Sequence, residues 1–114
     1  MSVREQMRKG TTTVILLNLL AEFDRPMYGY EIIQELEARS QGYFQFKEGL
    51  VYPRLHELER QGLLRAEWRG EEGTRRRKFY TITDAGRRQR EKELQSWKTF
   101  SRHVDDLLGV ESGS

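Results

Sequence analysis

Hydrophobic residues in the first third of the chain recur at the three- and four-residue spacing of helices. The segment from Val14 to Phe23 is apolar around much of a helical circumference, so it is expected to be buried. Thr11–Thr13 offer N-caps for this helix, and Arg25-Pro26 ends it because proline pushes the preceding residue out of the α region. A short amphipathic helix is predicted next, from Gly29 to about Ser40.

A third helix and a β-ribbon are predicted in the middle of the chain. The helix runs from Gly49 to Gln61 and stops at Gly62, and Pro53 fits only within its first turn. Leu63–Trp68 and Lys78–Ile82 are predicted as two strands, joined by a polar loop flanked by glycines.

The last predicted helix is unusually long. It is capped by Thr83 or Asp84 and runs to about Leu108. Its apolar residues lie at steps of three and four: Leu94, Trp97, Phe100, Val104, Leu107 and Leu108. Residues 1–10 are expected to form a basic N-terminal tail, and residues 109–114 a disordered polar end.

The order helix, helix, helix, strand, strand, helix is typical of a winged helix-turn-helix. The predicted fold is therefore mainly α with a two-stranded β wing, followed by a long C-terminal dimerisation helix. Residues 11–83 would form the DNA-binding domain and residues 84–108 the dimerisation helix. In such a fold the third helix enters the major groove and the wing contacts an adjacent phosphate backbone.

The charge distribution supports a nucleic-acid partner. The net charge is only +2, but residues 75–92 carry eight Lys or Arg against two acids, a net charge of +6. A concentrated basic block is expected of a phosphate-binding element. Arg75, Arg76, Arg77 and Lys78 begin this block, and alternate side chains along a ribbon would point to opposite faces, so at least two should reach phosphate.

The third helix supplies the residues expected to reach base edges. At 100° per residue its buried side is defined by Val51, Leu55 and Leu58. The opposite side and its flanks carry groups able to contact bases or phosphates. These are Tyr52, Pro53, Arg54, His56, Glu57 and Arg60.

A domain of 114 residues cannot cover every apolar residue of the last helix with its own core. A second copy is therefore expected to pair with this helix and form a twofold homodimer. Trp97 has two interpretations: plain packing in the dimer interface, or a wall of a pocket that stacks a flat aromatic ligand.

Enzymatic, redox and metal chemistry are not expected. The chain has no cysteine, and neither His56 nor His103 belongs to a recognisable metal-binding motif, so no cofactor is predicted. No nucleophile with an adjacent base can be assembled. Residues 1–9 lack the apolar core of a signal peptide, and Val14–Leu20 is too short to span a membrane, so a cytoplasmic location is expected.

Several of these motifs together resemble the PadR family of bacterial transcriptional regulators, from about Lys9 to Leu108. Met27–Ile32 resembles the opening of the family's second helix, and Glu48–Leu55 the start of its recognition helix. Leu58–Leu64 resembles the end of that helix, and Gly73–Gly86 the wing and its junction with the last helix.

The resemblance implies a winged-helix dimer joined through its C-terminal helices, usually a repressor of transcription that a small aromatic or drug-like molecule releases. It also implies phosphate contacts from Tyr52 and the wing, with Trp97 on the dimerising helix. Leu50 and Thr74 depart from the family pattern, since members commonly carry Thr or Ser at the first position and proline at the second. Both departures affect expected DNA contacts. The alternative function is a winged-helix module that binds a protein without specific DNA binding; the basic wing argues against it.

Overall fold

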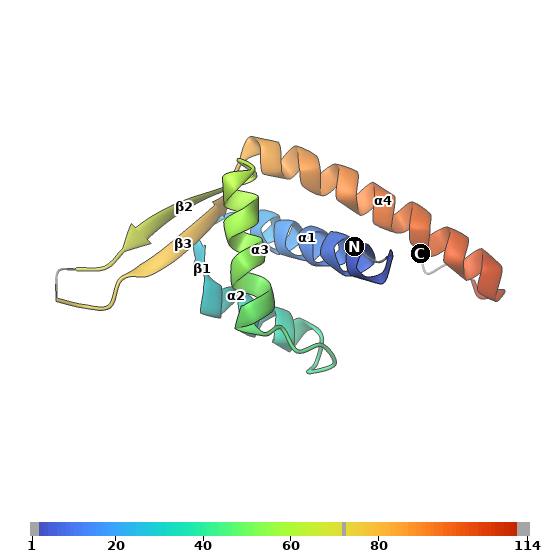
Figure 1. Ribbon diagram of the computed structural model, residues 1–114, viewed down its shortest axis with the longest axis horizontal. Helices are drawn as coiled ribbons and strands as arrows, with labels where there is room; N and C mark the ends of the chain where they lie inside the picture. Colours follow the sequence, from blue (N-terminus) through green and yellow to red (C-terminus); the bar gives the residue numbers. More distant parts are fainter. Residues whose placement is uncertain (1–2, 72, 112–114) are drawn as a thin grey trace.

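The computed structural model describes residues 3–71 and 73–111 of the chain. Three helices pack together at the centre: α1 (Val3–Phe23), α2 (Gly29–Arg39) and α3 (Glu48–Arg60). The ribbon of β2 (Leu64–Arg69) and β3 (Arg77–Ile82) projects from one end, and α4 (Asp84–Leu108) runs beside α1 towards the other (Figure 1). Across the described residues, no helix is both long and apolar enough to cross a bilayer.

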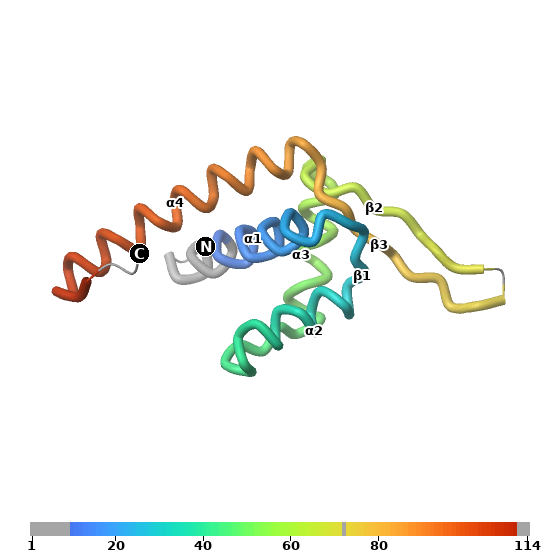
Figure 2. The backbone as a smooth tube through the Cα atoms, turned by 180° about the vertical axis from the view of Figure 1, so that it is seen from behind, coloured from blue at the N-terminus to red at the C-terminus, as the bar shows by residue number. Residues whose placement is uncertain are grey.

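The sheet has three strands, one more than the sequence predicted. β1 (Met27–Tyr28) pairs with β3 in antiparallel register, so the strand order is β1-β3-β2. A two-residue strand is too short to show alternation, which is why the pattern missed it. The winged-helix prediction is otherwise confirmed. β2 and β3 continue as a two-stranded ribbon beyond the part of β3 that pairs with β1 (Figure 2).

The core is an apolar cluster shared by α1, α2, α3 and the base of the sheet. Leu16, Leu17 and Leu20 of α1 are completely buried, as the continuous apolar pattern of this segment predicted. Leu19 is also from α1, Phe46 comes from the loop between α2 and α3, and the other members come from every remaining element except α4. They include Met27, Ile32, Ile33, Leu36, Val51, Leu55, Leu58, Leu64, Tyr80 and Ile82.

The start of α1 differs from the prediction. The helix begins at Val3, well before Thr11–Thr13, so these threonines lie inside it and the predicted tail of residues 1–10 is largely helical. Gly10, Thr11 and Val14 line a small cavity against α4. Tertiary contact of this kind overrides the weak helix propensity of Gly and Thr. Residues 1 and 2 lie outside the described residues.

Pro53 lies in the second turn of α3, whereas the sequence predicted the first. Proline has no N–H, so the helical hydrogen bond to the Gly49 carbonyl is missing. The helix nevertheless continues to Arg60, because Val51, Leu55 and Leu58 anchor it in the core on the other side.

Thr83 links the first turn of α4 to the turn that follows α3. Its hydroxyl oxygen accepts a hydrogen bond from the Gly86 N–H at 3.0 Å and donates to the Gly62 carbonyl at 2.8 Å, beyond the end of α3. This is the N-cap that the sequence predicted. At the other end Gly109 adopts a left-handed conformation, and the Val110 N–H donates to the Asp105 carbonyl. These two residues therefore cap α4 and do not begin the predicted disordered tail, whose residues 112–114 lie outside the described residues.

Candidate nucleic-acid interface

A cleft of about 680 Å³ lies between α3 and the β2–β3 ribbon. We call it the α3–ribbon cleft. Aromatic side chains and the basic segment after the ribbon loop line most of it, together with the first residues of α2 and one side of α3. The lining residues are Tyr28, Gly29, Tyr30, Glu48, Tyr52, His56, Trp68, Arg75, Arg76, Arg77, Lys78 and Tyr80.

The exposed side of α3 is the one that its periodicity predicted. Val51, Leu55 and Leu58 are buried, which turns Pro53, His56 and Arg60 towards solvent. Tyr52, Arg54 and Glu57 are half-buried at the flanks of this exposed side.

Tyr52 is held in place by a close approach to α2. A Cβ atom built on Gly29 would lie 2.0 Å from Cε1 of the tyrosine ring, so only glycine leaves room for the ring there. Burial raises the pKa of the Tyr52 phenol, with a smaller effect from Glu48. The hydroxyl therefore keeps its proton at neutral pH and can donate a hydrogen bond into the cleft.

Two of the polar groups on α3 engage each other. The Arg60 guanidinium forms an ion pair with the Glu57 carboxylate one turn earlier. The Gln61 side-chain amide also donates to that carboxylate, at 3.1 Å. Glu57 is thus occupied within the helix, while the guanidinium of Arg60 still has further N–H groups to donate. Arg54 is half-buried, and its Nε is buried with no hydrogen-bond partner among the described residues.

The basic tetrad of the wing divides into two parts. Arg75, Arg76 and Arg77 are exposed, and the Arg77 guanidinium lies 4.7 Å from the centre of the Tyr28 ring. Lys78 instead turns towards α3, where its Nζ lies 2.8 Å from Oε1 of Glu59. This hydrogen bond is the main cause of a raised pKa at Lys78.

Lys78 therefore ties the ribbon to α3, with its ammonium also near the Trp68 and Tyr80 rings. The sequence placed Lys78 with the phosphate contacts because neighbouring basic residues look alike in one dimension. It missed the aromatic lining of the cleft because the lining residues are far apart in the chain: Tyr28, Tyr30, Trp68 and Tyr80 come from four separate elements. A tryptophan directly opposite a lysine across a predicted hairpin was the one available signal.

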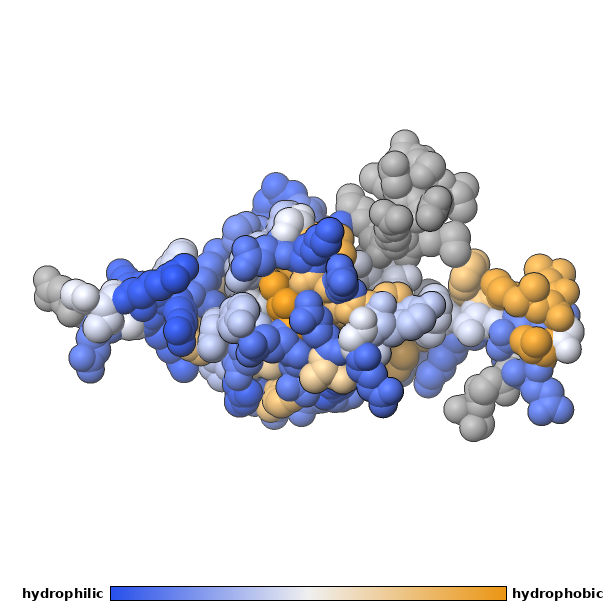
Figure 3. Space-filling model, turned by 90° about the horizontal axis from the view of Figure 1, so that it is seen from below, coloured by the Kyte–Doolittle hydropathy of each residue, from blue (hydrophilic) through white to orange (hydrophobic). Residues whose placement is uncertain are grey.

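The second unusual surface follows α4, in which only Gly86 is buried. We call the exposed apolar residues Trp97, Phe100, Leu107 and Leu108 the distal face of α4. Their exposed fractions are 44%, 43%, 88% and 69%, respectively. Leu94 and Val104, also predicted for this surface, are half-buried. Figure 3 shows an apolar patch at the far end of the molecule, opposite the hydrophilic ribbon.

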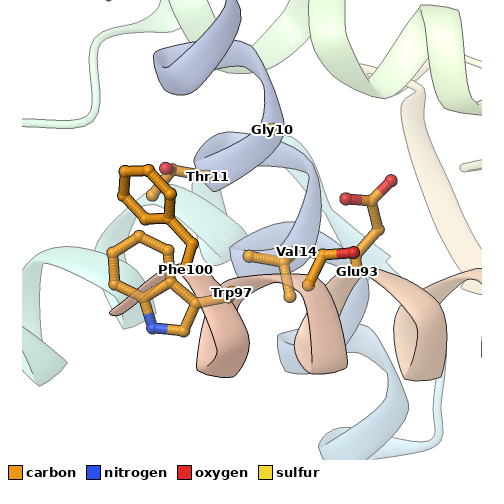
Figure 4. A pocket seen from close by; sticks show the side chains of 7 residues that line it. Gly10, Thr11, Val14, Glu93, Trp97 and Phe100 are labelled. Atoms are coloured by element: carbon orange, nitrogen blue, oxygen red, sulfur yellow. The ribbon is translucent and has the colours of Figure 1, made fainter. Parts of the chain in front are cut away.

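The Trp97 and Phe100 rings border a small cavity between α1 and α4. Its volume is about 150 Å³, and Gly10, Thr11 and Val14 face the two rings across it (Figure 4). The ring centres lie 6.2 Å apart. The mostly apolar walls suit a hydrocarbon group or the edge of an aromatic ring.

The proximal part of α4 is fixed firmly to the rest of the protein. The Arg90 guanidinium donates to Oδ1 of Asn18 from Nε at 3.1 Å and from Nη2 at 2.8 Å. Arg87 forms an ion pair with Asp24, just after α1. The direction in which α4 leaves the core is therefore set by polar contacts to α1.

Neither histidine is placed to bind a metal. His56 and His103 are exposed and lie on different helices. Within residues 3–71 and 73–111, no three His, Cys, Asp or Glu residues gather in a way that would hold an ion.

Comparisons with known proteins agree with this architecture. The model of the transcriptional regulator PadR-like family matches residues 16–92. The chain is 32% identical over 99 residues to the transcriptional regulator Rv3488 of Mycobacterium tuberculosis, covering 86% of this chain and 89% of that protein.

Solved structures give the same result. A transcriptional regulator from Clostridium thermocellum superposes with a TM-score of 0.78 at 28% identity, over 90% of this chain and 96% of that one. A PadR-like transcriptional regulator from Bacillus cereus superposes with a TM-score of 0.72 at 31% identity, over 93% and 99% of the two chains.

Proposed function

The chain belongs to the PadR-like family of transcriptional regulators, and on this premise we propose that it binds operator DNA sequence-specifically as a homodimer. Members of this family regulate transcription and are not enzymes; they bind DNA and typically act as dimers. The observation that carries the proposal is the α3–ribbon cleft, where exposed arginines and the exposed side of a recognition helix face one space.

In this proposal α3 enters the major groove and Arg75–Arg77 contact the phosphate backbone beside it. His56, Arg54 and Arg60 supply hydrogen-bond donors for bases or phosphates, and the Tyr52 hydroxyl donates to a phosphate. Backbone contacts are blind to sequence, so the wing provides affinity and salt dependence while α3 provides specificity. Lys78 supports the wing from within, through Glu59.

We assign residues 11–83 to the DNA-binding domain and residues 84–108 to the dimerisation helix. The distal face of α4 exposes four large apolar side chains along one helix, more than a solvated helix usually carries. A second copy that covers this face would form a twofold dimer. Its recognition helices would then read half-sites roughly 34–36 Å apart.

We further propose that the dimer represses transcription and that a small aromatic molecule at Trp97 releases it. The cavity beside Trp97 is about 150 Å³, smaller than the roughly 300 Å³ at which ligand pockets begin, so the second copy must complete such a site. Trp97 can serve the dimer interface alone, and a ligand titration that leaves its fluorescence unchanged would favour that interpretation.

The proposal is tested by binding to a labelled fragment of the protein's own upstream DNA and to unrelated DNA of equal length, at two salt concentrations. We expect tight, selective binding that weakens steeply with salt. The triple variant R75A/R76A/R77A should lose most of this affinity. R102A removes an exposed arginine from α4 and should retain the affinity.

Equal binding to both fragments, unaffected by the triple substitution, would contradict the proposal. It would favour the alternative in which the winged helix binds a protein.

A further inference from the structure

The N-terminal part of the recognition helix has an exposed apolar surface. Gly49 has no side chain, and nothing lies within 4 Å of the position where its Cβ would stand. Leu50 is 44% exposed, and Pro53 is also exposed three residues later. These three residues therefore form a surface with no side-chain hydrogen-bond donor or acceptor.

The surface also lacks the usual attraction of a helix N-terminus for phosphate. Glu48, the first residue of α3, places a carboxylate there, and Lys47 at the N-cap makes no side-chain hydrogen bond to the helix. A negative charge at a helix N-terminus stabilises the helix but repels a phosphate. This turn is consequently poorly suited to contact the DNA backbone.

Two carboxylates further along α3 are already engaged in contacts within the protein. Glu57 accepts from both Arg60 and Gln61. Lys78 of the wing occupies Glu59. The surface formed by Gly49, Leu50 and Pro53 is thus left to recognise bases through shape and apolar contact.

The apolar group that a base pair presents in the major groove is the C5-methyl of thymine. We propose that Leu50 and Pro53 contact pyrimidine C5-methyl groups, so that thymine at fixed positions of each half-site is recognised by van der Waals contact. This inference rests on the proposed DNA binding and adds the chemical feature of the operator that the first turns of α3 select. 5-Methylcytosine carries the same methyl group at the same place and is the second source of this chemistry.

The test begins with duplexes selected by the full-length protein from a random-sequence pool. The selected duplex is then synthesised with thymine, and again with deoxyuridine at every thymine, which removes the methyl groups and keeps the base pairing. A contacted methyl is worth about fourfold in affinity, so one contacted methyl in each of the two half-sites already gives roughly fifteenfold weaker binding to the deoxyuridine duplex.

Substitution of Leu50 separates this contact from any effect of the methyl groups on DNA shape. We expect L50S to show a clearly smaller preference for the thymine duplex, of which only the Pro53 contact remains. L50M should keep most of the preference because it keeps an apolar side chain. R76A should weaken binding to both duplexes alike and leave their ratio unchanged.

A third duplex, with 5-methylcytosine at every cytosine and deoxyuridine at every thymine, distinguishes the two sources. Recovery of affinity on this duplex, lost again in L50S, would assign the contact to 5-methylcytosine positions and support the inference. No recovery, with the thymine preference intact, would assign it to thymine.

Two results would overturn the inference while leaving the proposed function in place. One is equal affinity of the wild-type protein for the thymine and deoxyuridine duplexes. The other is an undiminished thymine preference in L50S. Failure to select any preferred duplex from the pool would instead overturn the proposed function, and this inference with it.

Discussion

The α3–ribbon cleft and the distal face of α4 lie at opposite ends of the molecule, and each exposes side chains that a folded core would bury or pair. In the cleft, arginines surround aromatic rings, and the Glu59–Lys78 contact holds the ribbon against α3. On α4, tryptophan, phenylalanine and leucines are exposed along the second half of a long helix. The cleft is complementary to a polyanion, and the distal face to another apolar surface.

This difference predicts how each surface responds to its surroundings. Contacts between arginines and phosphates weaken with salt because they depend on the release of counterions. Burial of apolar area depends little on moderate salt and follows protein concentration, as any association does. Substitutions in the cleft should therefore leave the dimerisation equilibrium largely unchanged.

The largest expected effect is on the distal face. Trp97→Ala should weaken the dimer several hundredfold, because a buried aromatic anchor is worth about 2 kcal/mol and twofold symmetry counts it twice. Analytical ultracentrifugation over a dilution series measures the shift. Trp68→Ala, in the cleft, removes the other tryptophan and should leave sedimentation unchanged. An unchanged dissociation constant for the Trp97 variant would remove the distal face from the dimer interface.

The next effect concerns the packing at the base of α4. Gly86→Ala should lower the free energy of unfolding by about 1–3 kcal/mol, because the new Cβ would lie 2.1 Å from the Leu63 carbonyl oxygen. Gly10→Ala is the matched control in a helix with open space, and it should raise stability by about 0.5–1 kcal/mol. Urea denaturation compares both. Equal stability of the two variants would mean that α4 is not anchored at its base.

A smaller effect belongs to the cleft. Arg76→Ala should weaken binding to all DNA sequences similarly and reduce the slope of log affinity against log salt by about one unit per subunit. Fluorescence anisotropy at several salt concentrations gives the slope. A loss of affinity confined to the preferred sequence would assign Arg76 to base recognition.

The smallest effect concerns the contact between ribbon and helix. Glu59→Gln should lower the free energy of unfolding by about 0.5–1 kcal/mol at neutral pH, as expected for a partly exposed ion pair. A larger effect on DNA affinity than on stability would show that the pair mainly orients the wing.

The same pair predicts a fall in stability at alkaline pH. The hydrogen bond from Lys78 to Glu59 raises the pKa of Lys78. Burial raises the pKa of Tyr80, whose ring lies near the Lys78 ammonium. Both groups hold their protons more tightly when folded, so their contribution is complete below about pH 10 and is lost as pH rises through the folded pKa. Urea midpoints from pH 8 to 11 should fall in the wild type and fall less in Glu59→Gln. If the urea midpoints of the two proteins fell in parallel with pH, Lys78 would be excluded as a cause of the loss of stability.

Periodicity predicted the fold well where one long element buries one face. The limits of α2, α3 and α4 differ from the predictions by a residue or so, because burial of Ile32, Leu55 and their neighbours imposes the helical repeat. The prediction was wrong where tertiary contact decides. α1 begins earlier than its apolar pattern indicated, and β1 exists only because β3 pairs with it.

The candidate site was predicted in composition and less well in geometry. The sequence predicted that Arg75–Lys78 lie on the wing and that at least two of them are exposed, since four adjacent basic residues cannot all turn inwards. Which of them turns towards α3 depends on Glu59, which is 19 positions away in the chain. The aromatic lining likewise depends on Tyr28 and Trp68, which only the folded sheet brings to one cleft.

The hydroxyl of Thr83 has a mechanical consequence. It links the turn that follows α3 to the first turn of α4, so the proposed recognition helix and the proposed dimerisation helix share one pivot. α4 has 25 residues and is therefore about 37 Å long. A tilt of about 5° at the pivot displaces the far end of such a lever by about 3 Å, close to the 3.4 Å rise of one base pair. A small change of angle at this threonine would thus shift the recognition helices of the dimer by about one base pair along the duplex.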